Sequence, residues 1–77
     1  MKSINITIET INDVKELVAI ANTFDFDIDL VSGRYAVDAK SIMGILSLDL
    51  AKPIKVNIHC DDADDFLNQI EKFKAVE

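Results

Sequence analysis

Ser41 is the residue of this chain whose type and position best suit a chemical modification. It follows Lys40 and precedes an apolar run, so we expect it to cap a short helix over about residues 41–48. A phosphate on its hydroxyl would lie near the free backbone N–H groups of that helix and near the lysine ammonium, and both favour negative charge. Ser41 is therefore a candidate regulatory phosphorylation site, and a simple helix cap is the alternative interpretation.

The same short helix carries more apolar residues than one face can bury. Ile42, Met43, Ile45 and Leu46 follow one another closely, whereas a helix that packs on a core buries a single stripe along its length. Some of these side chains should therefore face solvent. We expect Ile42, Met43 and Leu46, together with Lys40, to form a surface that binds a protein partner. The alternative is that all four apolar residues are buried.

His59 and Cys60 are the single histidine and the single cysteine of the chain. Because adjacent strand residues point to opposite faces of a sheet, these two side chains cannot readily bind one metal ion together. We expect His59 to be a partly exposed residue at a strand end and Cys60 to be a small apolar residue. No metal site and no cofactor are predicted.

Two groups of carboxylates are better explained by structure than by catalysis. Asp25, Asp27 and Asp29 alternate as on a solvated strand face, and an acidic cluster at 61–65 is typical of a helix start. A catalytic carboxylate pair needs a shared, partly desolvated cleft, and a calcium loop needs alternating ligands and a glycine that this cluster lacks. The sequence does not predict an enzyme.

Hydrophobic periodicity predicts the element order β-α-β-β-α-β-α. Apolar residues alternate with polar ones in four segments, and each alternation indicates a strand with one buried face. The predicted strands contain Ile4, Ile6 and Ile8; Phe26, Ile28 and Leu30; Tyr35 and Val37; and Ile54, Val56 and Ile58. Helical spacing predicts helices over about 11–23 and 41–48, and a last helix that Asp61 and Asp62 open and that carries Phe66, Leu67, Ile70 and Phe73 on one face.

Local signals fix two of the connections. Thr10 and Asp13 have the spacing of a capping box, with Asp in the role of the usual Glu or Gln, and they mark the start of the first helix. Ser32 and Gly33 supply the turn between the second and third strands, because glycine tolerates the positive φ that a tight hairpin requires.

Composition indicates a single small domain that spans residues 1–77, and it leaves proteins or small molecules, rather than polyanions, as partners. The chain is 49% hydrophobic with a net charge of −6, and it shows no basic stripe for nucleic acid and no attraction to an anionic membrane. No secretory signal and no transmembrane run are visible. With its lone cysteine, the chain is expected to be cytoplasmic.

The string from Lys40 to Gly44 and the predicted element order resemble the histidine-containing phosphocarrier (HPr) family of the bacterial sugar phosphotransferase system. The resemblance extends over nearly the whole chain, and Ala51-Lys52 matches the Ala-Lys that follows the family's regulatory-serine segment. It implies an α+β fold, the HPr-like open-faced β-sandwich, in which a four-stranded antiparallel sheet carries three helices on one face. It also implies that Ser41 is the target of a dedicated serine kinase.

The chain departs from the family at the phosphohistidine site. Family members carry a Gly-Ile/Leu-His-Ala-Arg-Pro string before the first helix, and in ungapped register Thr10 replaces the histidine, Asn12 the arginine and Asp13 the proline. Transfer needs a neutral imidazole as nucleophile and positive charge to hold the phosphoryl group. Glu9 and Glu16 add negative charge instead. The resemblance therefore implies a degenerate phosphohistidine site.

Together these observations favour a non-catalytic HPr-like regulatory or adaptor protein. It would bind a partner through the Ser41–Leu48 surface, with Ser41 phosphorylation as a candidate switch. The resemblance implies partners such as the serine kinase of the system or a transcriptional or enzyme regulator of sugar use. The alternative is a true phosphocarrier of the sugar phosphotransferase system. We expect a monomer or a weak dimer.

Overall fold

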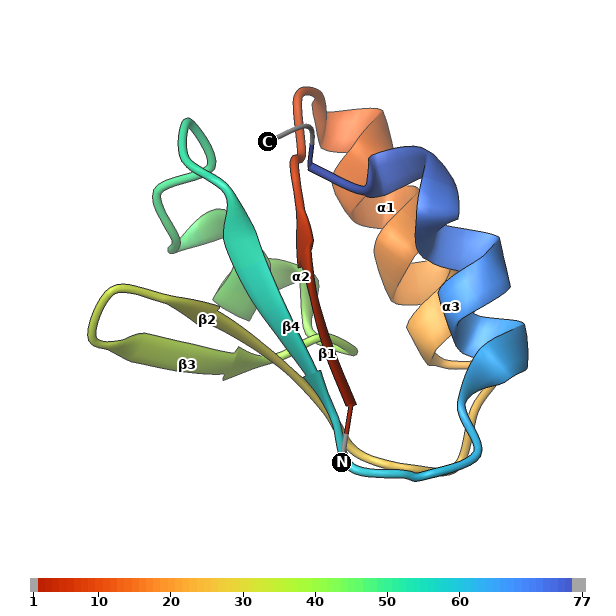
Figure 1. The fold of residues 1–77 in the computed structure, drawn as a ribbon. Coiled ribbons are helices and arrows are strands. Elements are labelled where there is room, and N and C mark those ends of the chain that lie inside the picture. Colours follow the sequence, from red (N-terminus) through yellow and green to blue (C-terminus); the bar gives the residue numbers. More distant parts are fainter. Residues whose placement is uncertain (1, 76–77) are drawn as a thin grey trace.

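The computed structural model describes residues 2–75, which form a four-stranded sheet with helices on one face (Figure 1). This arrangement confirms the predicted α+β class and the predicted order of elements. In chain order they are β1 (Lys2–Ile6), α1 (Ile11–Ala21), β2 (Ile28–Ser32), β3 (Tyr35–Asp38), α2 (Ile42–Leu46), β4 (Ile54–Ile58), α3 (Asp64–Ile70) and a final 3₁₀ turn, η1 (Glu71–Phe73).

The strands lie in the order β1-β4-β2-β3, and every neighbouring pair is antiparallel. Ile4 faces Val56, which faces Leu30, which faces Val37, so one apolar row crosses the whole sheet. Because successive strand residues point to opposite sides, this row and the residues two positions away from it lie on one face. Period-two alternation in the sequence therefore produces a single apolar face.

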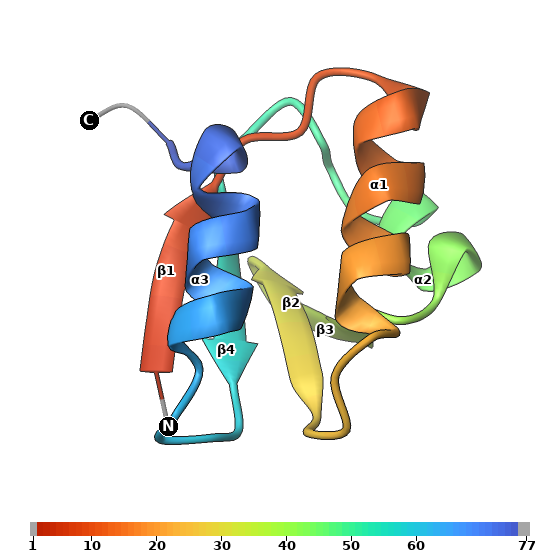
Figure 2. The ribbon, with the colours of Figure 1, turned by 90° about the vertical axis from the view of Figure 1, so that its right-hand side faces the viewer.

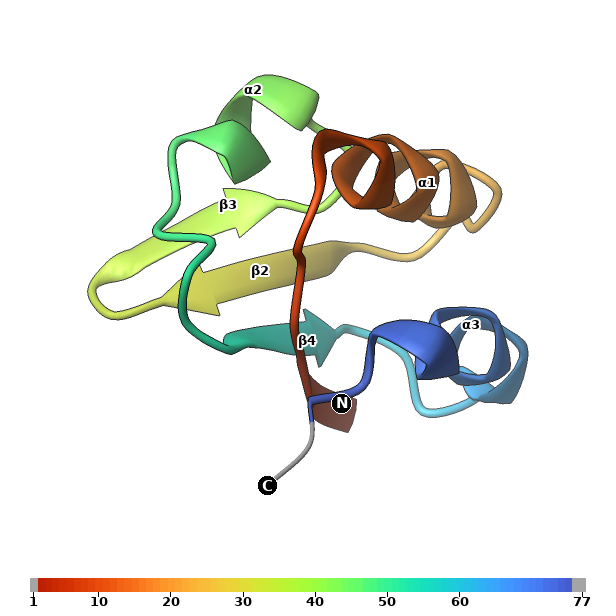
Figure 3. The ribbon, with the colours of Figure 1, turned by 90° about the horizontal axis from the view of Figure 1, so that it is seen from above.

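The opposite face of the sheet is polar and carries no helix. Its central row consists of Ser3, Asn57, Asp29 and Asp38, in adjacent registers across the four strands. Seen from above, the three helices all lie on the same side of the twisted sheet (Figure 3). One face packed and one face open is the arrangement that gives antiparallel sheets their hydrophobic-in, polar-out alternation.

Helices α1 and α3 lie side by side over the apolar face (Figure 2). α1 contributes four buried residues at helical spacing, which are Val14, Leu17, Val18 and Ala21. α3 contributes Phe66 and Ile70, both fully buried. The two helices thus close a core against buried strand residues such as Ile6, Leu30 and Val56.

An aromatic cluster joins the α1–β2 loop to α3. Phe24 meets Phe66 edge to face with ring centroids 5.4 Å apart, and Phe26 meets the same ring at 6.2 Å. The prediction that Phe26 lies within the second strand is wrong, because β2 begins at Ile28. Phe26 is fixed by ring contacts with Phe24 and Phe66 and not by hydrogen bonds between strands. In the sequence, its alternation with Asp25 and Asp27 looks the same as that of a strand residue.

α1 ends two residues earlier than predicted, at Ala21 instead of Thr23. The Asn22 amide donates to the carbonyl of Val18, and the Thr23 hydroxyl donates to the carbonyl of Ile20. The same two carbonyls also accept the backbone N–H groups of Asn22 and Thr23, so each side chain adds a second donor at the helix end. Asparagine and threonine terminate this helix by local hydrogen bonding.

α3 begins at Asp64, so the prediction that Asp61 and Asp62 open this helix is wrong. Ala63 is the residue at the cap position and its side chain is buried, so it offers no capping oxygen. The acidic side chains that do lie in the first turn are Asp64 and Asp65. A run of aspartates marks a helix start in sequence but does not say which of them enters the helix.

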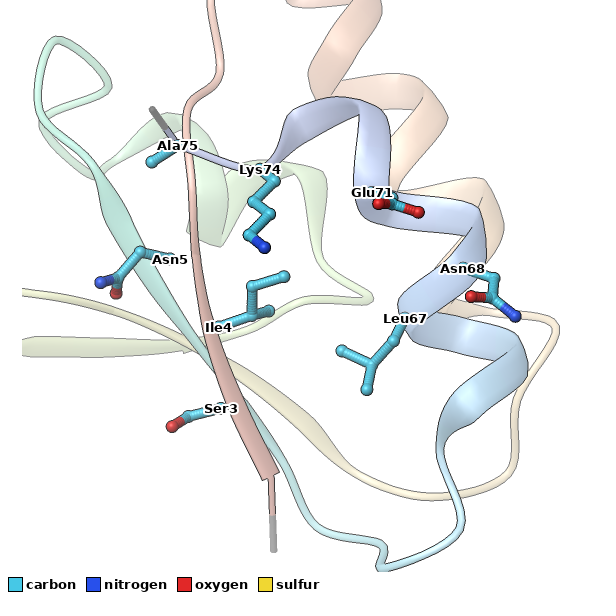
Figure 4. A pocket seen from close by; sticks show the side chains of 8 residues that line it. All are labelled: Ser3, Ile4, Asn5, Leu67, Asn68, Glu71, Lys74 and Ala75. Atoms are coloured by element: carbon cyan, nitrogen blue, oxygen red, sulfur yellow. The ribbon is translucent and has the colours of Figure 1, made fainter. Parts of the chain in front are cut away.

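The outer edge of β1 is partly covered by the chain that follows η1. The N–H of Thr7 donates to the carbonyl of Phe73 at 2.7 Å, and the N–H of Ala75 donates to the carbonyl of Asn5 at 3.0 Å. Beside it, Ile4 and Leu67 point toward each other across a hollow between β1 and α3 (Figure 4). Covering an edge strand in this way limits pairing with other chains.

We expect Phe66→Ala to lower the free energy of unfolding by about 3 to 5 kcal/mol, because it removes a fully buried ring at the centre of the aromatic cluster. Urea unfolding followed by circular dichroism measures the change. Gln69→Ala, on the exposed side of the same helix, is the control and should change stability by less than about 0.5 kcal/mol. Equal losses in the two variants would contradict this description of the core.

Candidate functional site

α2 buries one of its four large apolar side chains and exposes the other three. Ile45 is fully buried, whereas Ile42 is 40% exposed, Leu46 41% and Met43 81%. The alternative in which all four are buried therefore does not hold. We call Ile42, Met43 and Leu46 the α2 surface. Exposed apolar side chains that lie next to one another are typical of protein contact sites.

Ser41 occupies the cap position of α2 with an extended backbone. Its hydroxyl oxygen accepts a hydrogen bond from the N–H of Gly44 at 3.2 Å, and its carbonyl accepts from the N–H of Ile45 at 3.1 Å. The side chain is partly exposed. The predicted helix cap is thus present, on the residue directly before the α2 surface.

Gly44 lets α2 approach the sheet closely. A β-carbon at this position would lie 3.1 Å from the β-carbon of Val37 and 3.4 Å from the Ser41 hydroxyl oxygen. The first of these separations is tighter than ordinary side-chain contacts, so a side chain here would push the helix away from β3. Because Gly44 has no side chain, α2 can pack directly on Val37 and the Ser41 hydroxyl can stay close to the helix.

Lys40 is turned toward α1 rather than toward the α2 surface. Its ammonium donates to the carbonyl of Phe24 at 2.9 Å, and its backbone N–H donates to the Asp38 carboxylate at 2.8 Å. The first bond places a cation on the loop that follows the C-terminal end of α1, and positive charge is favourable near such an end. Lys40 thus ties the connection before α2 to the end of α1.

The start of α1 is closed by its own side chains. Thr10 accepts a hydrogen bond from the N–H of Asp13 at 3.1 Å, and the Asp13 carboxylate accepts from the N–H groups of Glu9 at 3.1 Å and Thr10 at 3.3 Å. The predicted capping box is therefore confirmed. Ile11 and Asn12, on the first turn, are exposed. No backbone donor in this capping box is left for a ligand.

Carboxylates dominate the surroundings of this helix start. Glu9, Asp13 and Glu16 line one hollow there, together with Lys72 and Lys74. Lys72 forms an ion pair with Glu16. An anionic group placed in this hollow would therefore meet three carboxylates and two lysines, one of which is already paired with Glu16.

His59 and Cys60 lie at the end of β4 and have separate partners. The imidazole Nε2 of His59 lies 2.8 Å from the carboxylate of Asp29, a contact that the sequence does not predict. The Cys60 thiol donates to the carbonyl of Asp62 at 3.3 Å. Within residues 2–75 no three histidine, cysteine or carboxylate side chains are placed to hold a metal ion.

A second feature missed in the sequence is a hollow between the β2–β3 hairpin and the α2–β4 loop. Its residues are Ser32, Gly33, Arg34, Tyr35, Ser47, Asp49 and Lys52. Tyr35 is 73% exposed. Gly33, with a φ of 61°, provides the positive φ of the two-residue hairpin loop and confirms the predicted turn. The contact brings together positions far apart in the chain, which is why no local motif reports it.

None of the helices formed by the described part of the chain has the length and apolar character needed to cross a membrane. The fold itself defines a class: an open-faced β-sandwich whose second helix presents apolar side chains next to a capping serine.

Comparison with known proteins identifies the family. The family model described as "PTS HPr component phosphorylation site" matches residues 11–75, which is most of the chain. The chain therefore belongs to the HPr family, the phosphocarrier-like proteins of the phosphotransferase system.

Solved structures agree with this assignment. HPr-C-His from Thermoanaerobacter tengcongensis is 26% identical with a TM-score of 0.79, over 94% of this chain and 89% of that one. Phosphocarrier protein HPr from Bacillus anthracis is 27% identical with a TM-score of 0.70, over 96% and 94%. The histidine-containing phosphocarrier protein of Mycoplasma is 18% identical with a TM-score of 0.75, over 92% and 89%, and shares the fold.

Ser41→Ala should lower the free energy of unfolding by about 1 kcal/mol, because the N–H of Gly44 loses its capping oxygen. Thermal or urea unfolding measures the loss. Ser3→Ala, on the open face of the sheet, is the matched control and should leave stability nearly unchanged. A Ser41→Ala variant as stable as the parent chain would show that the cap contributes nothing.

Proposed function

We propose that this chain is a non-catalytic regulatory or adaptor protein of the phosphotransferase system. It binds a protein partner through the α2 surface, and phosphorylation of Ser41 switches that binding. The observation that carries the proposal is the 81% exposure of Met43, the most exposed large apolar side chain among the described residues, two positions after the partly exposed Ser41. The expected partners are the serine kinase of the system and a transcriptional or enzyme regulator, in the cytoplasm.

The α2 surface suits a small, specific contact. Ile42, Met43 and Leu46 are held on one short helix whose fourth apolar residue, Ile45, is anchored in the core. A rigid base lowers the conformational entropy lost on binding. Methionine adapts to partners of different shape because its side chain is unbranched and polarizable. Removing these side chains from water on binding supplies the affinity.

Phosphorylation of Ser41 would change this surface by charge. The hydroxyl oxygen that accepts from Gly44 belongs to the residue directly before Ile42, the first residue of the α2 surface. A phosphate there adds a charge of about −1.5 to −2 and three acceptor oxygens. A partner that contacts the bare apolar surface would then meet a dianion, while a partner with arginine or lysine beside its apolar site would gain an ion pair.

The arrangement at the start of α1 supports a role without phosphoryl transfer. The family resemblance places Thr10 where phosphocarriers have their histidine, and Asn12 and Asp13 where they have arginine and proline. In this chain Thr10 and Asp13 cap each other. A phosphohistidine site needs an imidazole nucleophile and positive charge to hold the phosphoryl group. Thr10 has no imidazole, and the Asp13 carboxylate lies beside it.

The alternative, a true phosphocarrier, would need His59 as the acceptor. That imidazole shares a hollow with Asp27, Asp29 and Asp38, and its Nε2 already contacts Asp29. Three carboxylates around the acceptor would repel an incoming phosphoryl group. The surroundings of His59 therefore favour the regulatory proposal over the carrier.

Incubation with ATP and the serine kinase of a phosphotransferase system should place one phosphate on Ser41. Met43→Asp should raise the KM of this reaction about tenfold, which is the loss of a contact worth about 1.4 kcal/mol. Asn68→Asp, an equal charge change on the exposed side of α3, is the control and should leave the KM unchanged. Equal changes of the KM in the two variants would show that the kinase does not recognise the α2 surface.

Incubation with phosphoenolpyruvate and the first enzyme of the phosphotransferase system should leave the chain unlabelled. Acid-labile, base-stable label is the signature of a phosphohistidine, and the Bacillus anthracis HPr serves as the positive control. Label that disappears in a His59→Ala variant would establish the carrier alternative and overturn the regulatory proposal.

A further inference from the structure

Charge is distributed unevenly over the two ends of the sheet. Seen from above, the α1–β2 and β4–α3 loops lie at one end, and the β2–β3 hairpin tip and the α2–β4 loop lie at the other (Figure 3). The first end carries Asp25, Asp27, Asp61 and Asp62. The second end carries Arg34, which is the only arginine of the chain, Lys52 and Asp49. The second end is thus less acidic than the first.

The cations of the second end share the hollow between the hairpin and the α2–β4 loop, which has a volume of about 340 Å³. Within residues 2–75 neither Arg34 nor Lys52 forms an ion pair or a side-chain hydrogen bond. The one carboxylate of the hollow, Asp49, accepts a hydrogen bond from the N–H of Ala51 at 3.1 Å. The guanidinium and the ammonium therefore remain available to an anionic partner.

In four other hollows of the described chain, cationic side chains do not outnumber carboxylates. One is lined by a lysine and a glutamate and another by two lysines and three carboxylates. The remaining two contain carboxylates without lysine or arginine. A hollow in which cations outnumber carboxylates is thus a local exception in a chain with a net charge of −6.

The hollow lies at the C-terminal end of α2, the helix that carries the α2 surface. Ser47, at the end of α2, lines the hollow and lies four residues after Met43, so both occupy the same side of the helix. Tyr35 lies two residues before Val37 on β3 and therefore on the same face of the sheet, the face on which Gly44 packs. An exposed aromatic ring and two cations thus line a hollow at the end of the helix that carries the α2 surface.

We propose that the α2 surface and this hollow form one interface for an acidic, apolar segment of a partner protein. Apolar partner residues pack on Met43 and Tyr35, and partner carboxylates pair with Arg34 and Lys52. Two cations suit a short acidic peptide better than a nucleic acid or a membrane, since both of these need an extended basic surface. The inference rests on the proposed function and names the chemistry of the partner.

The test is a ¹⁵N NMR titration with two synthetic peptides that share the same leucine and phenylalanine residues and alternate them with either glutamate or lysine. The glutamate peptide should bind more tightly and shift the amides of Arg34, Tyr35, Met43, Ser47 and Lys52. Its affinity should fall about tenfold in R34E/K52E, because two attractive contacts become repulsive. Added salt should weaken binding by screening.

K55E/K74E is the matched control, with the same net charge and both changes away from the hollow. It should bind the glutamate peptide nearly as the parent chain does. Equal losses in the two double variants, preference for the lysine peptide, or no binding of the glutamate peptide would overturn the proposal. Binding of a single-stranded oligonucleotide with the same dependence on Arg34 and Lys52 would overturn it as well.

Met43→Ser separates this inference from the proposed function. Loss of binding in M43S with retention in R34E/K52E would leave the α2 surface as a docking site and exclude the acidic partner. Loss in R34E/K52E with retention in M43S would establish the basic hollow and remove the α2 surface from binding. Loss in both is the result that we expect.

Discussion

The close approach of α2 to β3 at Gly44 is the constraint on which the exposed surface depends. A β-carbon there would lie 3.1 Å from the β-carbon of Val37, so a side chain would force α2 or β3 to shift by a few tenths of an ångström. In this packing of α2 on β3, Ile45 points into the core and Met43 faces solvent. A short helix has little stability of its own. Its packing on the sheet, together with the Ser41 cap, therefore determines which apolar groups a partner can reach.

Most of the fold follows from periodicity in the sequence. Alternation of apolar and polar residues predicted the four strands, because a sheet with one buried face requires this pattern. Apolar residues at helical spacing predicted the three helices. The errors lie at the element ends. Phe26 has the spacing of a strand residue but is fixed by ring contacts with Phe66, and the aspartates before Ala63 resemble a helix start that lies further on. Tertiary packing, which no local pattern encodes, decided both cases.

The candidate site was only partly accessible to sequence reasoning. The density of apolar residues predicted that some of α2 faces solvent, and the Thr10–Asp13 spacing predicted the closed start of α1. The hollow with Arg34 and Lys52 was not predicted, because the two residues meet only after α2 turns the chain back past the hairpin. The turn of the Lys40 side chain onto Phe24 likewise depends on where α1 ends.

The most direct test of the central claim is a cross-saturation NMR measurement on the chain, with its methyl groups labelled, in complex with the serine kinase of a phosphotransferase system. The proposed function predicts that the methyl signals of Ile42, Met43 and Leu46 lose intensity, since these side chains are exposed on α2. Loss of intensity confined to Ile4 and Leu67, which line the hollow between β1 and α3, would contradict it.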